Sequence, residues 1–111
     1  MKTGEGAADA VFDALADTTR RAVLRAVAED GPLTATELAA RLPVSRQAVA
    51  KHLDVLREAG LVSSARSGRD VRFSFHAEPL GEAVDWITAT GARWDRRLAA
   101  LQRRLEPERG P

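Results

Sequence analysis

Residues 44–62, which read VSRQAVAKHLDVLREAGLV, decide the fold. At about 100° per residue, this stretch predicts one helix with two unlike halves. Ser45 is suited to cap the first turn, and Gly60 supplies the positive φ that commonly ends a helix. The apolar half holds Val49, Leu53 and Leu56, flanked by Ala48, His52, Val55 and Ala59. The polar half, which we expect to face outward, holds Arg46, Gln47, Ala50, Lys51, Asp54, Arg57 and Glu58.

A second helix is predicted directly upstream. Thr34 and Glu37 have the spacing of a capping box, in which each side chain bonds the backbone amide of the other residue. The box opens a short helix with an apolar face from Thr36 to Leu42, and Pro43 ends it. The two helices and the tight turn between them form a helix-turn-helix.

A β-hairpin is predicted downstream. Val62 to Arg66 and Val71 to His76 are expected to be strands joined by the turn Ser67-Gly68-Arg69-Asp70. In the second strand, apolar residues alternate with polar ones, as a half-buried strand requires. A helix-turn-helix followed by a basic hairpin is a winged helix.

Three blocks of the sequence together resemble one family. They are residues 12–21 (FDALADTTRR), residues 45–62 and residues 68–75. From about Val11 to Leu105 the sequence resembles the ArsR/SmtB family of bacterial winged-helix repressors, whose opening segment, recognition helix and wing these blocks match. It departs from the family pattern at Thr18, where proline is usual, and at Ala50, where serine is common.

The resemblance implies a mainly α-helical protein with a small β-hairpin wing, in the order α-α-α-α-β-β-α. The 111 residues, 44% hydrophobic and 30% charged, suffice for one domain with one core. We expect a disordered start (1–6), two helices (7–30), the helix-turn-helix (34–60), the wing (61–76), a C-terminal helix (79–105) and a tail (106–111).

Several functional classes are excluded by composition. With no cysteine, disulfides, thiolate metal sites and cysteine nucleophiles are ruled out. The first residues lack an apolar run for export or anchoring, so we expect a cytoplasmic protein. No catalytic spacing and no glycine-rich phosphate loop occurs, so the sequence predicts neither an enzyme nor a bound cofactor.

Charge is distributed unevenly although the net charge is only +1. Residues 1–43 carry a net −2, residues 44–72 a net +3 and residues 73–111 a net zero. The basic excess therefore coincides with the recognition helix and the wing. Together with the helix-turn-helix pattern, it predicts a surface that faces the phosphates of double-stranded DNA.

The first turns of the recognition helix are expected to read bases, because arginine suits guanine and glutamine suits adenine. Arg46 and Gln47 are therefore the candidates for base edges, and Ala50 for a thymine methyl group. Lys51 can bind phosphate or reach a base, and Arg57 fits either DNA or a surface salt bridge. Arg69 at the wing tip should reach the minor groove or its phosphates, with Arg66 and Arg72 in supporting positions at the strand ends. The predicted DNA-binding set is Ser45, Arg46, Gln47, Ala50, Lys51, Arg66, Arg69 and Arg72.

Apolar residues from Leu80 onward recur at alternating steps of four and three, which is a heptad seam. A helix from 80 to 105 would be about 38 Å long, more than one small domain can cover. The helix either folds back on its own domain or meets a second copy. In the resembling family, the first and last helices form the homodimer interface. The predicted interface is Val11, Phe12, Leu15, Val84, Ile87, Gly91, Trp94, Leu98, Leu101 and Leu105.

A metal site is not expected, although many members of the resembling family sense metals. The family's thiolate position falls on residues 36–42, which lack cysteine, and the last helix has no histidine. Glu82 and Asp85 alone make a poor transition-metal site. His52 is expected to be packed and hydrogen-bonded, and His76 is isolated in the sequence. Trp86, off the seam, either packs on the first helix or stays partly exposed.

These observations predict a homodimeric repressor that binds an inverted-repeat operator. In such a dimer, two recognition helices about 34 Å apart meet successive major grooves. One alternative is a winged helix used only for protein interaction, against which the arginines of the helix and wing argue. Another is a repressor that responds to a small molecule at the dimer interface. The sequence does not identify an effector.

Overall fold

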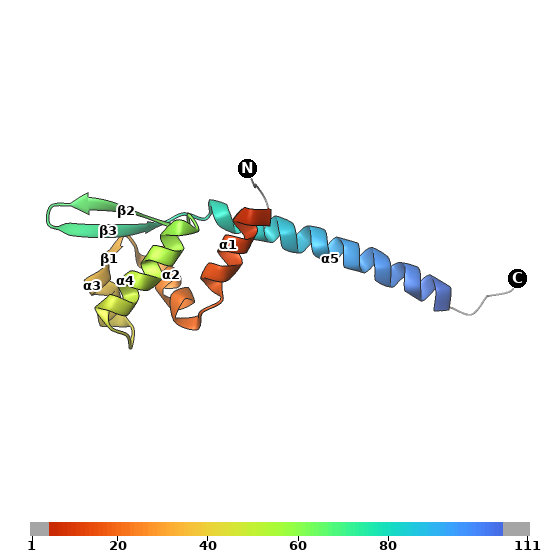
Figure 1. Cartoon of the computed structure of the whole chain (residues 1–111), viewed down its shortest axis with the longest axis horizontal. Helices are drawn as coiled ribbons and strands as arrows, with labels where there is room; N and C mark the ends of the chain where they lie inside the picture. The colour runs from red at the N-terminus through yellow and green to blue at the C-terminus, as the bar shows by residue number, and fades with distance from the viewer. Residues whose placement is uncertain (1–4, 106–111) are drawn as a thin grey trace, which may run out of the picture.

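The computed structural model describes residues 5–105 as a helical body, a small sheet and one long projecting helix (Figure 1). The elements, in order, are α1 (Glu5–Leu15), α2 (Thr18–Asp30), β1 (Leu33–Thr34), α3 (Ala35–Arg41), α4 (Arg46–Glu58), β2 (Val62–Ser67), β3 (Asp70–Phe75) and α5 (Glu78–Leu105). The predicted winged helix-turn-helix is confirmed. The expected tail (106–111) and residues 1–4 of the expected disordered start lie outside the described residues, whereas residues 5 and 6 are helical.

Helices α3 and α4 begin directly after residues whose side chains cap the first turn. The Ser45 hydroxyl accepts a hydrogen bond from the Ala48 amide at 3.0 Å and so opens α4. At α3, Thr34 and Glu37 form the predicted capping box, with N···O distances of 3.0 and 2.9 Å. Since Thr34 is itself the cap, α3 begins at Ala35, one residue earlier than expected. Gly60, at φ 77°, ends α4 as predicted.

The sheet contains one strand that the sequence pattern did not predict. Its strand order is β1-β3-β2 and both pairings are antiparallel. β1 has only two residues, which is too short for an alternating pattern, and Leu33 pairs with Phe73. The wing turn is tighter than expected, because the strands extend to Ser67 and Asp70, and Gly68 has a φ of 64° that suits a two-residue turn.

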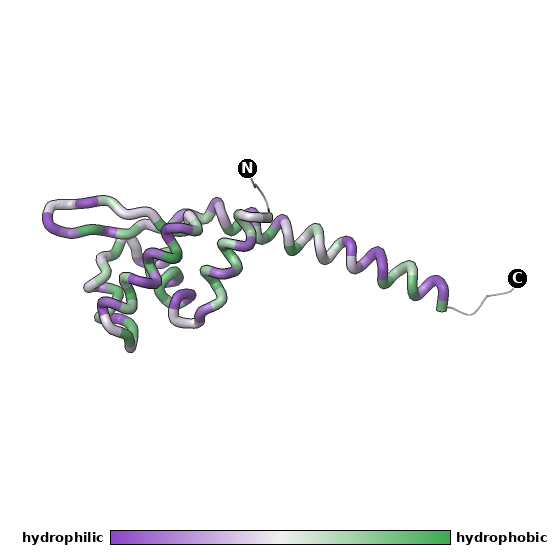
Figure 2. Tube along the Cα trace, viewed as in Figure 1, coloured by the Kyte–Doolittle hydropathy of each residue, from purple (hydrophilic) through white to green (hydrophobic). Residues whose placement is uncertain are grey.

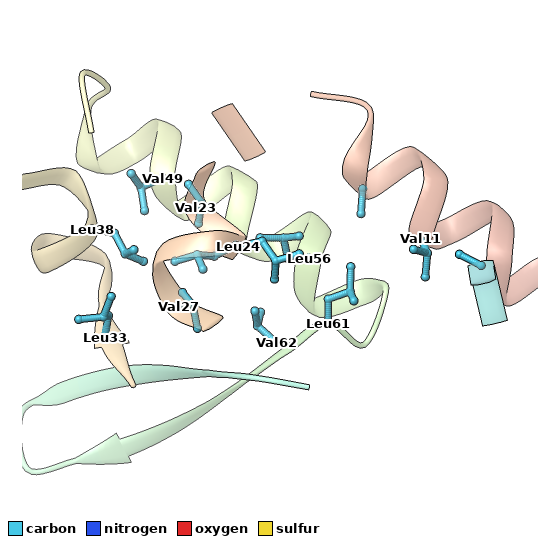
Figure 3. Close-up of a cluster of buried hydrophobic side chains, with 13 residues drawn as sticks. Val11, Val23, Leu24, Val27, Leu33, Leu38, Val49, Leu56, Leu61 and Val62 are labelled. Atoms are coloured by element: carbon cyan, nitrogen blue, oxygen red, sulfur yellow. The ribbon is translucent and has the colours of Figure 1, made fainter. Parts of the chain in front are cut away.

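The core lies between α2, α3, α4 and the sheet (Figure 3). The apolar half of α4 enters it, since Val49, Leu53 and Leu56 have at most 1% of their surface exposed. Leu38 of α3 and side chains of α2, including Val23, surround them. Burial of this one face fixes which face of α4 remains outside.

α1 packs on the first half of α5. Val11 and Ala83 are buried there, and Phe12 meets Trp86 edge to face with ring centroids 5.5 Å apart. Val11, which the sequence analysis placed in the dimer interface, is 0% exposed inside its own chain. Trp86 fulfils both alternatives, since it packs on α1 and remains 43% exposed.

The second half of α5 extends away from the body (Figure 1), and the principal extents are 78 × 34 × 19 Å. Apolar segments alternate with polar ones along its whole length (Figure 2). Among the described residues, six large apolar side chains of α5 beyond Leu80 that belong to the predicted seam are exposed: Val84, Ile87, Trp94, Leu98, Leu101 and Leu105. No helix between residues 5 and 105 has the apolar length to cross a membrane.

Leu53→Ala tests whether α4 is anchored by its buried face. We expect a loss of about 2–5 kcal/mol in the free energy of unfolding, because a large core side chain leaves a cavity. Val71→Ala on the wing, where the side chain is 37% exposed, should cost much less. Urea unfolding at one fixed protein concentration measures both variants. Equal losses would contradict the proposed anchoring.

Candidate nucleic-acid interface

The outward face of α4 begins at its capped first turn. Ser45 holds this turn in place through its bond to Ala48. Arg46 and Gln47 follow the cap directly and are exposed, and Ala50 and Lys51 are exposed one turn later. The structure thus presents these four predicted DNA-binding residues on the surface of α4.

A shallow groove of about 490 Å³ lies beside this turn. It runs between the start of α3 and the start of α4, and it is lined by Ala35, Ser45, Arg46, Gln47 and Ala50. Four of these five residues belong to the predicted DNA-binding set. Ala35 was not predicted, because its place beside α4 depends on how the two helices cross.

A second groove of about 530 Å³ separates α3 from the wing. Arg46 of α4 and Arg69 of the wing tip both line it, although 22 residues separate them in the sequence. Arg72 and Thr36 line it as well. Sequence reasoning missed Thr36, whose only signal was an exposed hydroxyl beside the capping box. Lys51 and Arg66 are exposed but line neither groove.

Four basic side chains of this surface have no salt-bridge partner among the described residues. They are Arg46, Lys51, Arg66 and Arg69. Arg57 differs, because its guanidinium is 2.9 Å from a carboxylate oxygen of Asp54. The surface-salt-bridge interpretation of Arg57 is therefore confirmed. The other four charges remain available to phosphate or base acceptors.

Arg72 has a different environment from the other wing arginines. One of its guanidinium nitrogens donates to Glu37 Oε1 at 3.2 Å, and the other lies 3.5 Å from Asp70. Glu37 Oε1 also accepts the Thr34 amide of the capping box. This contact, followed by the hydroxyl of Thr34 and the charge of Arg72, holds the pKa of Glu37 below its ordinary value. Arg72 thus ties the wing to α3.

Neither of the two histidines lines either groove. His52 is half-buried as expected, but the expected hydrogen bond is not found at Nδ1, which is buried without a partner among the described residues. His76 Nε2 lies 2.6 Å from the Ser63 hydroxyl at the base of the wing. Within residues 5–105, no group of three or more His, Asp or Glu side chains lies close enough to hold a metal ion.

Comparison with known proteins places the chain among bacterial regulators. Residues 15–65 match the family described as a helix-turn-helix domain. The uncharacterized HTH-type transcriptional regulator YuzN of Bacillus subtilis is 47% identical over 89 residues, which cover 74% of this chain and 97% of that protein. The transcriptional repressor SdpR of the same species is 30% identical over 77 residues. This match covers 69% of this chain and 84% of SdpR.

Among solved structures, the ArsR-like transcriptional regulator from Rhodococcus sp. RHA1 is 40% identical, with a TM-score of 0.82. The match covers 94% of this chain and 97% of that one. It therefore includes the helix-turn-helix, the wing and most of α5.

Glu37→Gln and Glu37→Ala separate the two contacts of this carboxylate. Glutamine keeps an acceptor for the cap but loses the charge that pairs with Arg72, whereas alanine loses both. We therefore expect Glu37→Ala to lower the urea midpoint more than Glu37→Gln. Glu29→Gln, an exposed glutamate without a salt bridge among the described residues, serves as control.

The same variants predict a dependence on pH. A carboxylate whose folded pKa is lowered stabilises the fold above its unfolded pKa of about 4.3, and this stabilisation is lost as the pH falls through the folded pKa. The difference in urea midpoint between wild type and Glu37→Gln should be constant near neutral pH and should disappear in acid. A difference that is unchanged at pH 3 would contradict the role of the ionised carboxylate.

Proposed function

Because the chain belongs to the ArsR/SmtB family of DNA-binding helix-turn-helix transcriptional regulators, we propose that it acts in the cytoplasm as a homodimeric repressor of an inverted-repeat operator. The observation that carries the proposal is the convergence of Arg46 and Arg69 on one groove beside the exposed start of α4. The likeness to the transcriptional repressor SdpR supports repression. As a member of this family, the chain is a regulator and not an enzyme.

In the proposed complex, α4 enters the major groove with its first turn against the bases. Arg46 and Gln47 read base edges, Ala50 contacts a thymine methyl group, and Lys51 binds phosphate. Their exposure, together with the absence of a salt bridge to Arg46 or Lys51 among the described residues, supports these roles. Arg69 and Arg66 hold the backbone beside the minor groove.

A second copy is proposed because one recognition helix reads too little sequence and because α5 leaves a long apolar strip uncovered. Monomeric proteins rarely expose a contiguous apolar surface of more than a few hundred Å². The exposed strip runs from Val84 to Leu105. A two-fold dimer formed there, with Phe12 and Leu15 at its margin, would repeat the recognition helix and so select an inverted repeat.

Alanine variants separate base reading from backbone binding. Arg46→Ala and Gln47→Ala should each weaken operator binding by about 1–3 kcal/mol and leave binding to random DNA largely intact. Arg69→Ala should weaken both by similar factors and reduce the salt slope by up to about two in a dimer, if each wing releases about one counterion. Fluorescence anisotropy at several salt concentrations measures each variant, on an operator first selected from random duplexes.

The matched control is Arg57→Ala, which removes a charge that is paired with Asp54 at the far end of the same helix. It should change neither affinity nor specificity appreciably. If Arg46→Ala and Gln47→Ala keep the full operator preference, the base-reading role of α4 is refuted. If the wild type binds no DNA even at low salt, the chain is a protein-interaction module.

Leu98→Glu tests the proposed dimer. Leu98 is 40% exposed in the single chain, and two buried glutamates in a seam should cost several kcal/mol of association free energy. We expect a wild-type dimer at micromolar concentration and a monomeric variant in sedimentation velocity. Ala89→Glu, on the opposite face of α5, should remain dimeric. A monomeric wild type, or a Leu98→Glu variant that stays dimeric, would refute the interface.

A further inference from the structure

The tip of the wing has little to hold it against the rest of the domain. β1 pairs with β3 only through its own two residues, whose partners are Phe73 and Arg72, so the hairpin has no third strand beyond Arg72. Every residue of β2 after Val62 is exposed, as are the first two residues of β3. Between residues 63 and 71, therefore, no buried apolar side chain anchors the tip. A two-stranded hairpin on its own is marginally stable in water.

One carboxylate connects this tip to the helix-turn-helix. Oε1 of Glu37 accepts the amide of Thr34 at 2.9 Å within the capping box, and it also accepts a guanidinium nitrogen of Arg72 at 3.2 Å. The other terminal nitrogen of Arg72 lies 3.5 Å from a carboxylate oxygen of Asp70, the residue that follows Arg69. A chain of charged contacts thus runs from the first turn of α3 to the neighbour of the wing-tip arginine.

These contacts lie along the groove that separates α3 from the wing. The groove is lined by all three members of the charged chain and by one proposed DNA-binding arginine from each side: Glu37, Asp70, Arg72, Arg46 and Arg69. The side chains of Arg72 and Glu37 are 37% and 47% exposed. Ion pairs this exposed contribute little to the stability of a whole fold. Their place between the two arginines indicates a role in positioning the wing.

We propose that Glu37 is a positioning residue for DNA binding. Through Arg72, its carboxylate fixes the wing tip relative to the start of α4, so that Arg69 reaches the DNA backbone while Arg46 reaches the bases. Arg72 then serves DNA binding through the wing, without touching phosphate itself. A wing that is already in place loses less conformational entropy when DNA binds. This inference rests on the proposed DNA binding and extends it to an acidic residue, which charge alone would set against DNA.

Glu37→Gln gives opposite results for positioning and for simple electrostatics. If only charge matters, loss of a negative charge beside the DNA should tighten binding. Glutamine still accepts the cap amide but pairs weakly with Arg72, so positioning predicts operator binding about three- to tenfold weaker, within the range of coupling in one charge network. Glu29→Gln removes the same charge from an exposed site on α2 and should not weaken binding. An unchanged or tighter Glu37→Gln complex in fluorescence anisotropy overturns the proposal.

A double-mutant cycle shows whether Glu37 acts through the wing tip. If its carboxylate positions Arg69, then Arg69→Ala should cost much less affinity in the Glu37→Gln background than in the wild type. Arg46→Ala should cost the same in both backgrounds, because α4 is held by its own buried face. Equal losses for Arg69→Ala in the two backgrounds would overturn the positioning role. A wild type that binds no DNA would overturn the proposed function and this inference with it.

Limited proteolysis tests the same contact without DNA. Trypsin cleaves after Arg66 when the hairpin opens, and mass spectrometry identifies the cut. In the free protein, Glu37→Gln should speed this cut severalfold, because local opening sets the rate of cleavage. Glu29→Gln should leave it unchanged, and cleavage after Arg97 in α5 should be the same in all variants. Cleavage of the wing at the wild-type rate would overturn the positioning role and leave the proposed DNA binding intact.

Discussion

Burial of one face of α4 is the interaction on which the rest of the structure depends. Val49, Leu53 and Leu56 are almost fully enclosed, and each such side chain stabilises the fold by roughly 1.5–3 kcal/mol. Rotation of α4 by one residue, about 100°, would expose this stripe and bury charged groups. The contact that holds the helix therefore also fixes the outward position of Arg46 and Lys51. In this domain, burial of one face of α4 both stabilises the core and positions the proposed reading surface.

The sequence predicted correctly the features that depend on residues close together in the chain. The Ser45 cap and the Thr34–Glu37 box each join residues three positions apart, and both occur as predicted. Gly60 and Gly68 adopt the positive φ that only glycine accommodates readily. The helical period of α4 fixed its buried face. The solvent-facing half of the proposed site, Arg46, Gln47, Ala50 and Lys51, followed from the same period.

The features that sequence reasoning missed depend on residues far apart in the chain. β1 forms because Leu33 pairs with Phe73, which lies 40 positions later in the sequence. A strand of two residues is too short to show an alternating pattern. Arg72 was predicted as a supporting DNA-binding residue, and the fold brings its side chain to Glu37, 35 positions earlier in the sequence, where its charge ties the wing to α3. Val11 is apolar, as an interface residue would be, yet it is fully buried within its own chain. No local pattern distinguishes a side chain buried by its own chain from one buried by a partner.

The charge distribution along α5 explains why the net charge of the chain says so little about DNA binding. One side of the helix belongs to its own domain through Ala83 and Trp86, and the adjacent strip is proposed to belong to the second copy. The acidic first half and the basic second half of α5 offset each other in the net charge. With α5 nearly neutral, the net +3 of residues 44–72 is the excess left for phosphate. A net charge near zero is thus compatible with DNA binding when opposite charges are assigned to different surfaces.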